Sequence, residues 1–157
     1  MKTIPMVTMT LALALGIARA ETPATPAPPG YDAALAQKLG ADEHGMRSYV
    51  LVILKTGPQR MPKGPERDAM FKGHFANMER LAADGKLVVA GPFGDEGGDW
   101  RGLFIFDVKT VDEARALTAT DPVIINGEMI AEYHVYYGSA ALKLVNDAHA
   151  RVQKKSP

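Results

Sequence analysis

The sequence predicts an α+β fold in which a four-stranded antiparallel sheet carries two helices on one face. Four short apolar runs have the length and the β-branched and aromatic residues of strands. Two longer segments repeat apolar residues every three or four positions, as helices do. These segments alternate in the order β-α-β-β-α-β, which is the order of a ferredoxin-like plait.

The first strand is expected at residues 49–55, where six apolar residues precede Lys55. Such an uninterrupted run is typical of a strand that is buried on both faces. A helix is expected at residues 66–84, because Gly85 follows an apolar stripe with helical spacing. The stripe that should face the sheet consists of Phe71, Phe75, Met78 and Ala82.

The remaining elements follow from the same two periods. Strands are expected at residues 87–90, 102–108 and 129–137, and helices at residues 31–39, 111–119 and 139–153. The helices at 31–39 and 139–153 are additions at the two ends of the plait. Since the first strand is apolar on both sides, the sheet face away from the helices also needs cover. A second copy of the chain would supply it, so the sequence predicts a homodimer.

The first 20 residues have the parts of a secretory signal peptide. Lys2 precedes an apolar core at residues 6–18, and Ala18 and Ala20 are the small residues expected before a cleavage site. The core is shorter than the roughly 20 apolar residues that span a bilayer. We therefore expect an exported protein, periplasmic or secreted, although a retained N-terminal anchor helix is the alternative.

The rest of the chain divides by composition into four parts. Residues 21–30 contain four prolines and end in glycine, which is typical of an extended linker. A helical extension is expected at residues 31–48, the main domain at 49–145, and the end of the last helix with a tail at 146–157. No segment after residue 20 resembles a membrane span, so we expect no membrane contact after cleavage.

Charge and composition exclude several classes of function. Removal of Lys2 and Arg19 with the signal leaves 16 basic and 18 acidic residues, a net charge of −2 without a basic cluster. This argues against a nucleic acid partner. The chain has no cysteine, which excludes thiolate ligands and cysteine nucleophiles. The histidines do not have the spacing of a zinc site, so neither a metal nor a cofactor is expected.

A series of short motifs occurs in a distinctive order and spacing. They are Thr56-Gly57-Pro58, Gly73-His74, Ala90-Gly91-Pro92-Phe93, Arg101-Gly102-Leu103, Thr120-Asp121-Pro122 and Tyr137-Gly138-Ser139. By these motifs the chain resembles the YCII-related (YciI-like) family, within the dimeric α+β barrel superfamily. The resemblance covers residues 31–145.

His74 and Asp121 are the candidate catalytic residues. His74 flanks the apolar stripe of its helix, where an imidazole is either a core residue with one hydrogen bond or a general base or acid. Asp121, which precedes Pro122, is on sequence alone more typical of a turn or a helix cap. The resemblance implies the functional alternative for both, since the proposed active site of the family is a histidine–aspartate dyad.

A small-molecule pocket is also expected. Gly91 and Pro92 are typical of a turn, but the resemblance implies that they line a pocket toward which the backbone amide of Phe93 or Gly94 points. It places Arg101 among the substrate-binding residues as well. Ser139 is expected either to cap the last helix or to supply a hydroxyl group to the pocket.

The function that this resemblance implies is a proton transfer without a cofactor. Related activities are a dehydrochlorination and a lactone isomerisation. The expectation is therefore a lyase or isomerase that acts on a small cyclic or aromatic molecule, with His74 as the base and Asp121 orienting it. The alternative is a non-catalytic ligand-binding or stress-related module on the same fold.

Overall fold

The computed structural model describes residues 27–94 and 97–155. The chain divides into two units, Met1–Tyr31 and Asp32–Pro157, and the second contains every helix and strand discussed below. The expected signal peptide at residues 1–20 and the first part of the linker lie outside the described residues. In the described part of the chain, no helix has both the length and the apolar character needed to cross a membrane.

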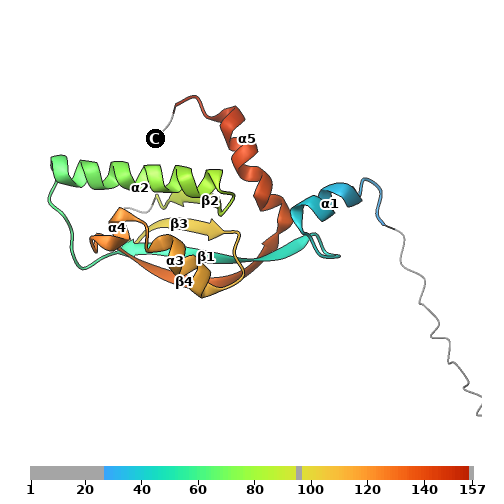
Figure 1. The fold of residues 1–157 in the computed structure, drawn as a ribbon, viewed down its shortest axis with the longest axis horizontal. Helices are drawn as coiled ribbons and strands as arrows, with labels where there is room; N and C mark the ends of the chain where they lie inside the picture. Colours follow the sequence, from blue (N-terminus) through green and yellow to red (C-terminus); the bar gives the residue numbers. More distant parts are fainter. Residues whose placement is uncertain (1–26, 95–96, 156–157) are drawn as a thin grey trace, which may run out of the picture. The chain divides into compact units, whose positions relative to one another are not determined.

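A four-stranded antiparallel sheet forms the centre of the second unit, as predicted (Figure 1). Its strands are β1 (Met46–Thr56), β2 (Leu87–Pro92), β3 (Trp100–Phe106) and β4 (Met129–Ser139). The order across the sheet is β2-β3-β1-β4, so β1 pairs with both β3 and β4. This order and the alternation with helices confirm the ferredoxin-like arrangement.

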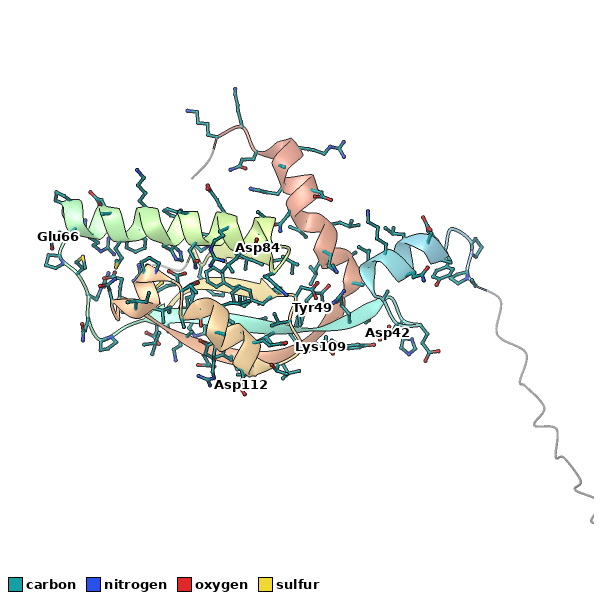
Figure 2. All side chains as sticks on the ribbon, in the orientation of Figure 1. Asp42, Tyr49, Glu66, Asp84, Lys109 and Asp112 are labelled. Atoms are coloured by element: carbon teal, nitrogen blue, oxygen red, sulfur yellow. The ribbon has the colours of Figure 1, made fainter. Side chains whose placement is uncertain are left out.

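Two of the predicted helices are present between strands: α2 (Pro65–Ala83) follows β1, and α3 (Val111–Thr118) follows β3. Glu66 and Asp84 mark the two ends of α2 in Figure 2. The sequence did not predict the short helix α4 (Pro122–Ile125), which follows α3 after a turn. Four residues are too few for helical periodicity to be visible, and only Pro122 at the first helical position indicates the helix.

The chain ends differ in detail from the prediction. The N-terminal helix α1 (Ala33–Leu39) begins at its cap Asp32 and ends at Gly40, which adopts a left-handed conformation (φ 66°). The predicted single helix at residues 139–153 is wrong. Strand β4 continues to Ser139, a 3₁₀ helix η1 (Ala140–Leu144) follows, and α5 (Val145–Val152) comes last.

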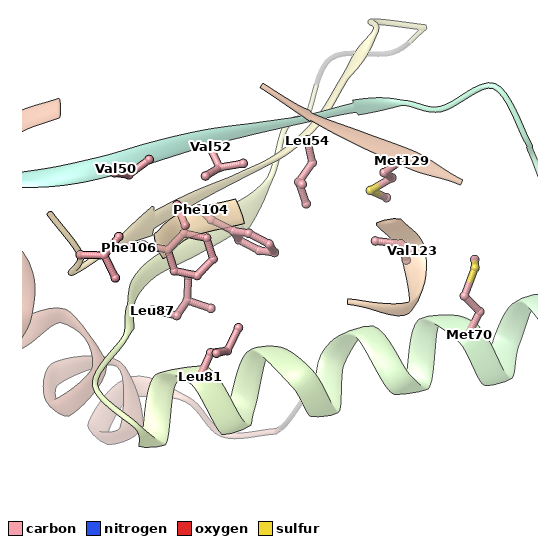
Figure 3. Packing of buried hydrophobic residues seen from close by; sticks show 12 residues of the cluster. Val50, Val52, Leu54, Met70, Leu81, Leu87, Phe104, Phe106, Val123 and Met129 are labelled. Atoms are coloured by element: carbon pink, nitrogen blue, oxygen red, sulfur yellow. The ribbon is translucent and has the colours of Figure 1, made fainter. Parts of the chain in front are cut away.

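The main core lies between the sheet and the helices. Figure 3 shows Val50, Val52 and Leu54 pointing from β1 toward Leu81 of α2, with Phe104 and Phe106 between them. The alternate residues of β1, Tyr49 and Ile53, are also buried. The strand is therefore buried on both faces, as its apolar run predicts.

The face of the sheet away from α2 is partly covered by the same chain. Tyr49, Val88 and Ile105 form a second buried cluster there, and Leu142 of η1 packs against it. Farther along the same face, Ile130 is 48% exposed. The C-terminal segment thus provides some of the cover that we expected from a second copy, and the homodimer stays a prediction.

Helix α3 begins with a reciprocal capping arrangement, next to Lys109 and Asp112 in Figure 2. The hydroxyl of Thr110 accepts a hydrogen bond from the amide of Glu113 (3.2 Å), and the Glu113 carboxylate accepts one from the amide of Thr110 (3.0 Å). Loss of such a cap costs about 1 kcal/mol. We expect Thr110→Ala to lower the free energy of unfolding by this amount in urea titrations. Thr110→Ser, which keeps the hydroxyl, should stay close to the wild type, and equal losses in both variants would contradict the cap.

Candidate active site

Helix α2 buries two polar residues where the sequence predicts an apolar stripe. The residues that face the core are Met70, His74, Asn77 and Leu81, one position away from the predicted stripe. Phe75 is instead 37% exposed. The prediction failed because it assigned the core face by hydrophobicity alone. Buried polar groups are stable there only because partners satisfy them. The segment between α3 and α4 supplies Asp121 for His74 and Thr120 for Asn77, and Arg80 of α2 also donates to Asn77.

His74 and Asp121 form a buried pair. The Nδ1 atom of His74 lies 2.9 Å from Oδ1 and 2.8 Å from Oδ2 of Asp121, and the residues are 6% and 0% exposed. Since an ionised carboxylate only accepts hydrogen bonds, this geometry assigns the ring hydrogen to Nδ1. The neutral imidazole then carries its lone pair on Nε2.

Asp121 also serves as the cap that the isolated sequence indicated. Its Oδ1 accepts a hydrogen bond from the amide of Val123 (3.1 Å), at the start of α4. Beside it, Thr120 donates to Oδ1 of Asn77 (2.9 Å), which joins the same turn to α2 a second time. The two alternatives for Asp121, cap and histidine partner, are therefore both realised in one side chain.

Aromatic rings fix the plane of the imidazole. The ring of Phe104 stacks on it at a centroid distance of 6.0 Å and an interplanar angle of 27°, and Phe71 meets it edge-on at 6.1 Å. Among the described residues, Nε2 has no hydrogen-bond partner. The ring is thus held by Asp121 on one side, while its second nitrogen is free for another contact.

His74 lines a cavity of about 300 Å³ between α2 and the sheet. The other lining residues are mostly apolar and come from α2, from the four strands and from the residue after β2: Leu54, Phe71, Phe75, Met78, Gly91, Pro92, Phe93, Arg101, Gly102, Phe104 and Met129. A small, largely apolar cavity with few polar groups is typical of a ligand site. Among the described residues that line it, only His74 and Arg101 are ionisable.

A buried carboxylate lies beside this cavity. Glu128 is 0% exposed, accepts a hydrogen bond from Arg67 (2.7 Å) and accepts another from the amide of Met61 (2.8 Å). Burial raises the pKa of Glu128, but the hydrogen bonds from Arg67 and Met61 and the charges of Arg67 and Arg101 outweigh it and lower the pKa overall. Glu128 is therefore held in its charged form.

Comparison with known proteins identifies the family. The model of the YCII-related domain matches residues 48–137, which is more than half of the chain. The chain belongs to the YCII-related domain family. The matched region runs from β1 into β4, and α1, η1 and α5 lie outside it.

No curated protein sequence matches this chain, whereas several solved structures do. The chain is 25% identical to 5-chloro-2-hydroxyhydroquinone dehydrochlorinase (TftG) from Burkholderia phenoliruptrix AC1100, solved with 2,5-dihydroxybenzoquinone. The alignment covers 53% of this chain and 90% of the other, with a TM-score of 0.37.

Within the YCII-related domain, the structure brings most of the predicted site residues together. His74, Gly91, Pro92, Phe93 and Arg101 line the same cavity, with Asp121 behind His74. Gly91 and Pro92 belong to β2 rather than to a turn after it, and their pairing with β3 continues to Pro92. A proline is tolerated there because β2 is an edge strand.

Two of the side chains and amides expected to contact a ligand are engaged within the protein. The amide of Phe93 donates to the carbonyl oxygen of Arg101 (3.1 Å), so of the two amides expected to face a ligand, that of Gly94 stays a prediction. Ser139 does not line the cavity; its hydroxyl accepts a hydrogen bond from the amide of Ala141 (3.2 Å) and caps η1. Of the two alternatives for Ser139, the structure shows the cap.

Sequence reasoning missed Glu128 and Arg67. They lie 61 positions apart and meet only because Gly57, after β1, packs on the turn before β4. A Cβ atom on Gly57 would lie 2.1 Å from the carbonyl oxygen of Gly127, so only glycine fits. Two features of the sequence could have indicated this contact: the Gly57-Pro58 motif, and the position of Glu128 directly before the strand β4.

Proposed function

We propose that this protein is a lyase or isomerase that moves a proton on a small cyclic or aromatic molecule and needs no cofactor. The supporting observation is the pairing of His74 Nδ1 with Asp121 at 2.8 Å in a histidine that also lines a small apolar cavity. A histidine whose tautomer is fixed by a carboxylate is a suitable general base.

In the proposed reaction, Nε2 of His74 takes a proton from a carbon of the bound molecule. Asp121 keeps the other ring hydrogen in place and stabilises the imidazolium ion that forms. If the protein is a lyase, the electron pair of the broken C–H bond forms a new double bond, and a leaving group on the adjacent carbon departs with its bonding pair. As an isomerase, the imidazolium returns the proton to another carbon and the double bond moves.

The cavity limits the size of the molecule. A cavity of about 300 Å³ is at the lower end of the range for ligand pockets. It can hold a single ring with a few substituents, since a cavity of about 150 Å³ accepts benzene. The signal features at residues 1–20 lead us to propose that the protein acts in the periplasm or outside the cell.

Deuterium exchange tests this proposal without knowledge of the product. The protein is incubated in D₂O with a panel of hydroxylated, chlorinated and lactone-containing single-ring compounds, and ¹H NMR follows the loss of each C–H signal. We expect at least one compound to exchange faster with protein than without it. If compounds raise the melting temperature but none exchanges or is converted, the protein is a binding module and the proposed reaction is wrong.

A further inference from the structure

Two arginines lie near the buried carboxylate of Glu128 beside the cavity. Arg67 and Arg101 both lie near Glu128, but only Arg67 forms a hydrogen bond with it, at 2.7 Å. Nη1 of Arg101 lies 4.0 Å from Oε1 of Glu128, beyond hydrogen-bond distance. Among the described residues, two permanently charged guanidinium groups thus lie beside the single carboxylate of Glu128.

One donor atom of Arg101 is buried without an acceptor. Among the described residues, Nη1 of Arg101 has no hydrogen-bond partner, although it is not accessible to solvent. Leaving a buried, charged donor unsatisfied is unfavourable. The guanidinium group is thus weakly satisfied within the protein, and it also lines the cavity. An anionic oxygen in the cavity would be a strong acceptor for it, because a charge-assisted hydrogen bond is about twice as strong as a neutral one.

Arg101 lies where two hollows meet. It lines the apolar cavity together with His74, and it also lines a more polar hollow together with Arg60, Asp99 and Trp100. The two hollows share Arg101 and Phe93. A ring inside the apolar cavity could therefore direct a polar substituent toward Arg101 and the polar hollow, while its other edge lies toward His74.

From this arrangement we infer that the protein binds small single-ring molecules that carry a negatively charged oxygen, and that Arg101 binds this oxygen. The part of this inference that concerns catalysis rests on the proposed function. When His74 takes a proton, the electron pair left on the substrate is stabilised if it can move onto an oxygen bound by a cation. Arg101 would thus select anionic substrates and stabilise the charge that develops during the reaction.

Matched pairs of probes test the inference by binding alone. Salicylate is compared with salicylamide, and 4-nitrophenolate with nitrobenzene, by isothermal titration calorimetry. The first pair tests a carboxylate and the second a phenolate as the source of the negative oxygen. We expect at least one anion to bind more tightly than its neutral partner. Arg101→Gln should weaken the binding of that anion by about 10- to 100-fold and change the neutral partner by less than threefold.

Two variants serve as controls. Arg101→Lys, which keeps the charge, should retain part of the preference, and Arg151→Gln, on α5 outside the cavity, should bind like the wild type. Thermal melting of each variant establishes that it is folded. Binding of none of the anions, or equal weakening of anionic and neutral probes in Arg101→Gln, would overturn the inference.

The inference and the proposed function fail in different ways. Anion binding that depends on Arg101, without deuterium exchange on any compound, would leave the inference standing and remove the proposed reaction. Deuterium exchange on neutral rings that is unaffected by Arg101→Gln would leave the reaction standing and remove the inference.

Discussion

Replacement of His74 by asparagine should reduce the rate of proton exchange on a turned-over compound by about 10²- to 10⁴-fold, the usual contribution of a general base. Asparagine can place an amide N–H near the position of Nδ1, so the contact with Asp121 can be kept while Nε2 is removed. The measurement is the initial rate of loss of the C–H signal in D₂O. A rate within threefold of the wild type would show that His74 is not the base.

Asp121→Asn is the matched variant for the partner. Asparagine is a good N-cap, so the hydrogen bond from Val123 to residue 121 should persist. The charge that stabilises the imidazolium is lost, and we expect a reduced rate of exchange with the fold retained. Long-range ¹H–¹⁵N NMR of the imidazole reports the tautomer, which should be Nδ1–H in the wild type. The hydrogen on Nε2 in the wild type would contradict the pairing.

Replacement of Arg67 by methionine should cause a large loss of stability. Methionine preserves much of the aliphatic stem but leaves Glu128, which is 0% exposed, without its hydrogen-bonded cation. Breaking a buried ion pair in this way costs about 3–5 kcal/mol. Arg67 also lies over the ring of Phe71 at 4.6 Å. Urea denaturation at pH 7 measures the change.

The double variant Arg67→Met, Glu128→Gln provides the control, because it also removes the buried negative charge that Arg67→Met leaves without a partner. We expect it to recover part of the lost free energy of unfolding. If Arg67→Met alone changes this free energy by less than 1 kcal/mol, the ion pair does not hold the structure together.

Acid should reveal the same pair in the wild type. The pKa of Glu128 is lowered in the folded state from its usual 4.5, so the unfolded chain binds protons more readily below that pH. The stabilisation by Glu128 is therefore complete above about pH 4.5 and is lost as the pH falls from there through the lowered pKa. Glu128→Gln should not show this part of the acid destabilisation.

The fold was predictable because the apolar residues of most elements repeat clearly with the spacing of either a strand or a helix. The apolar run of β1 and the order of strands and helices were sufficient for the plait. The C-terminal segment was misjudged because Ser139 caps a 3₁₀ turn instead of the final helix, and helical spacing alone does not distinguish the two. The short helix α4 has too few residues to show any period.

The site was predictable where a motif marks it and hidden where distant residues meet. His74 and Asp121 were assigned as a pair through the family resemblance, whereas the isolated sequence favoured a turn or helix-cap role for Asp121. The core face of α2 was predicted one position away from the observed one, because the polar residues His74 and Asn77 occupy core positions and hydrophobicity alone does not place polar residues there. Glu128 and Arg67 come together through the packing at Gly57, which is a tertiary contact that no local pattern reports.

Because Asp121 both caps α4 and pairs with His74, the folding of α4 is coupled to the orientation of the catalytic base proposed for this site. One carboxylate both starts α4 and fixes the ring of His74. A local opening of α4 that swings this carboxylate away would release the imidazole at the same moment, so a partly opened molecule would lack an oriented base. Conversely, a ligand that favours the paired histidine would also slow the opening of α4. Hydrogen exchange at the amide of Val123, far from solvent in the closed state, would then act as a gauge of site occupancy.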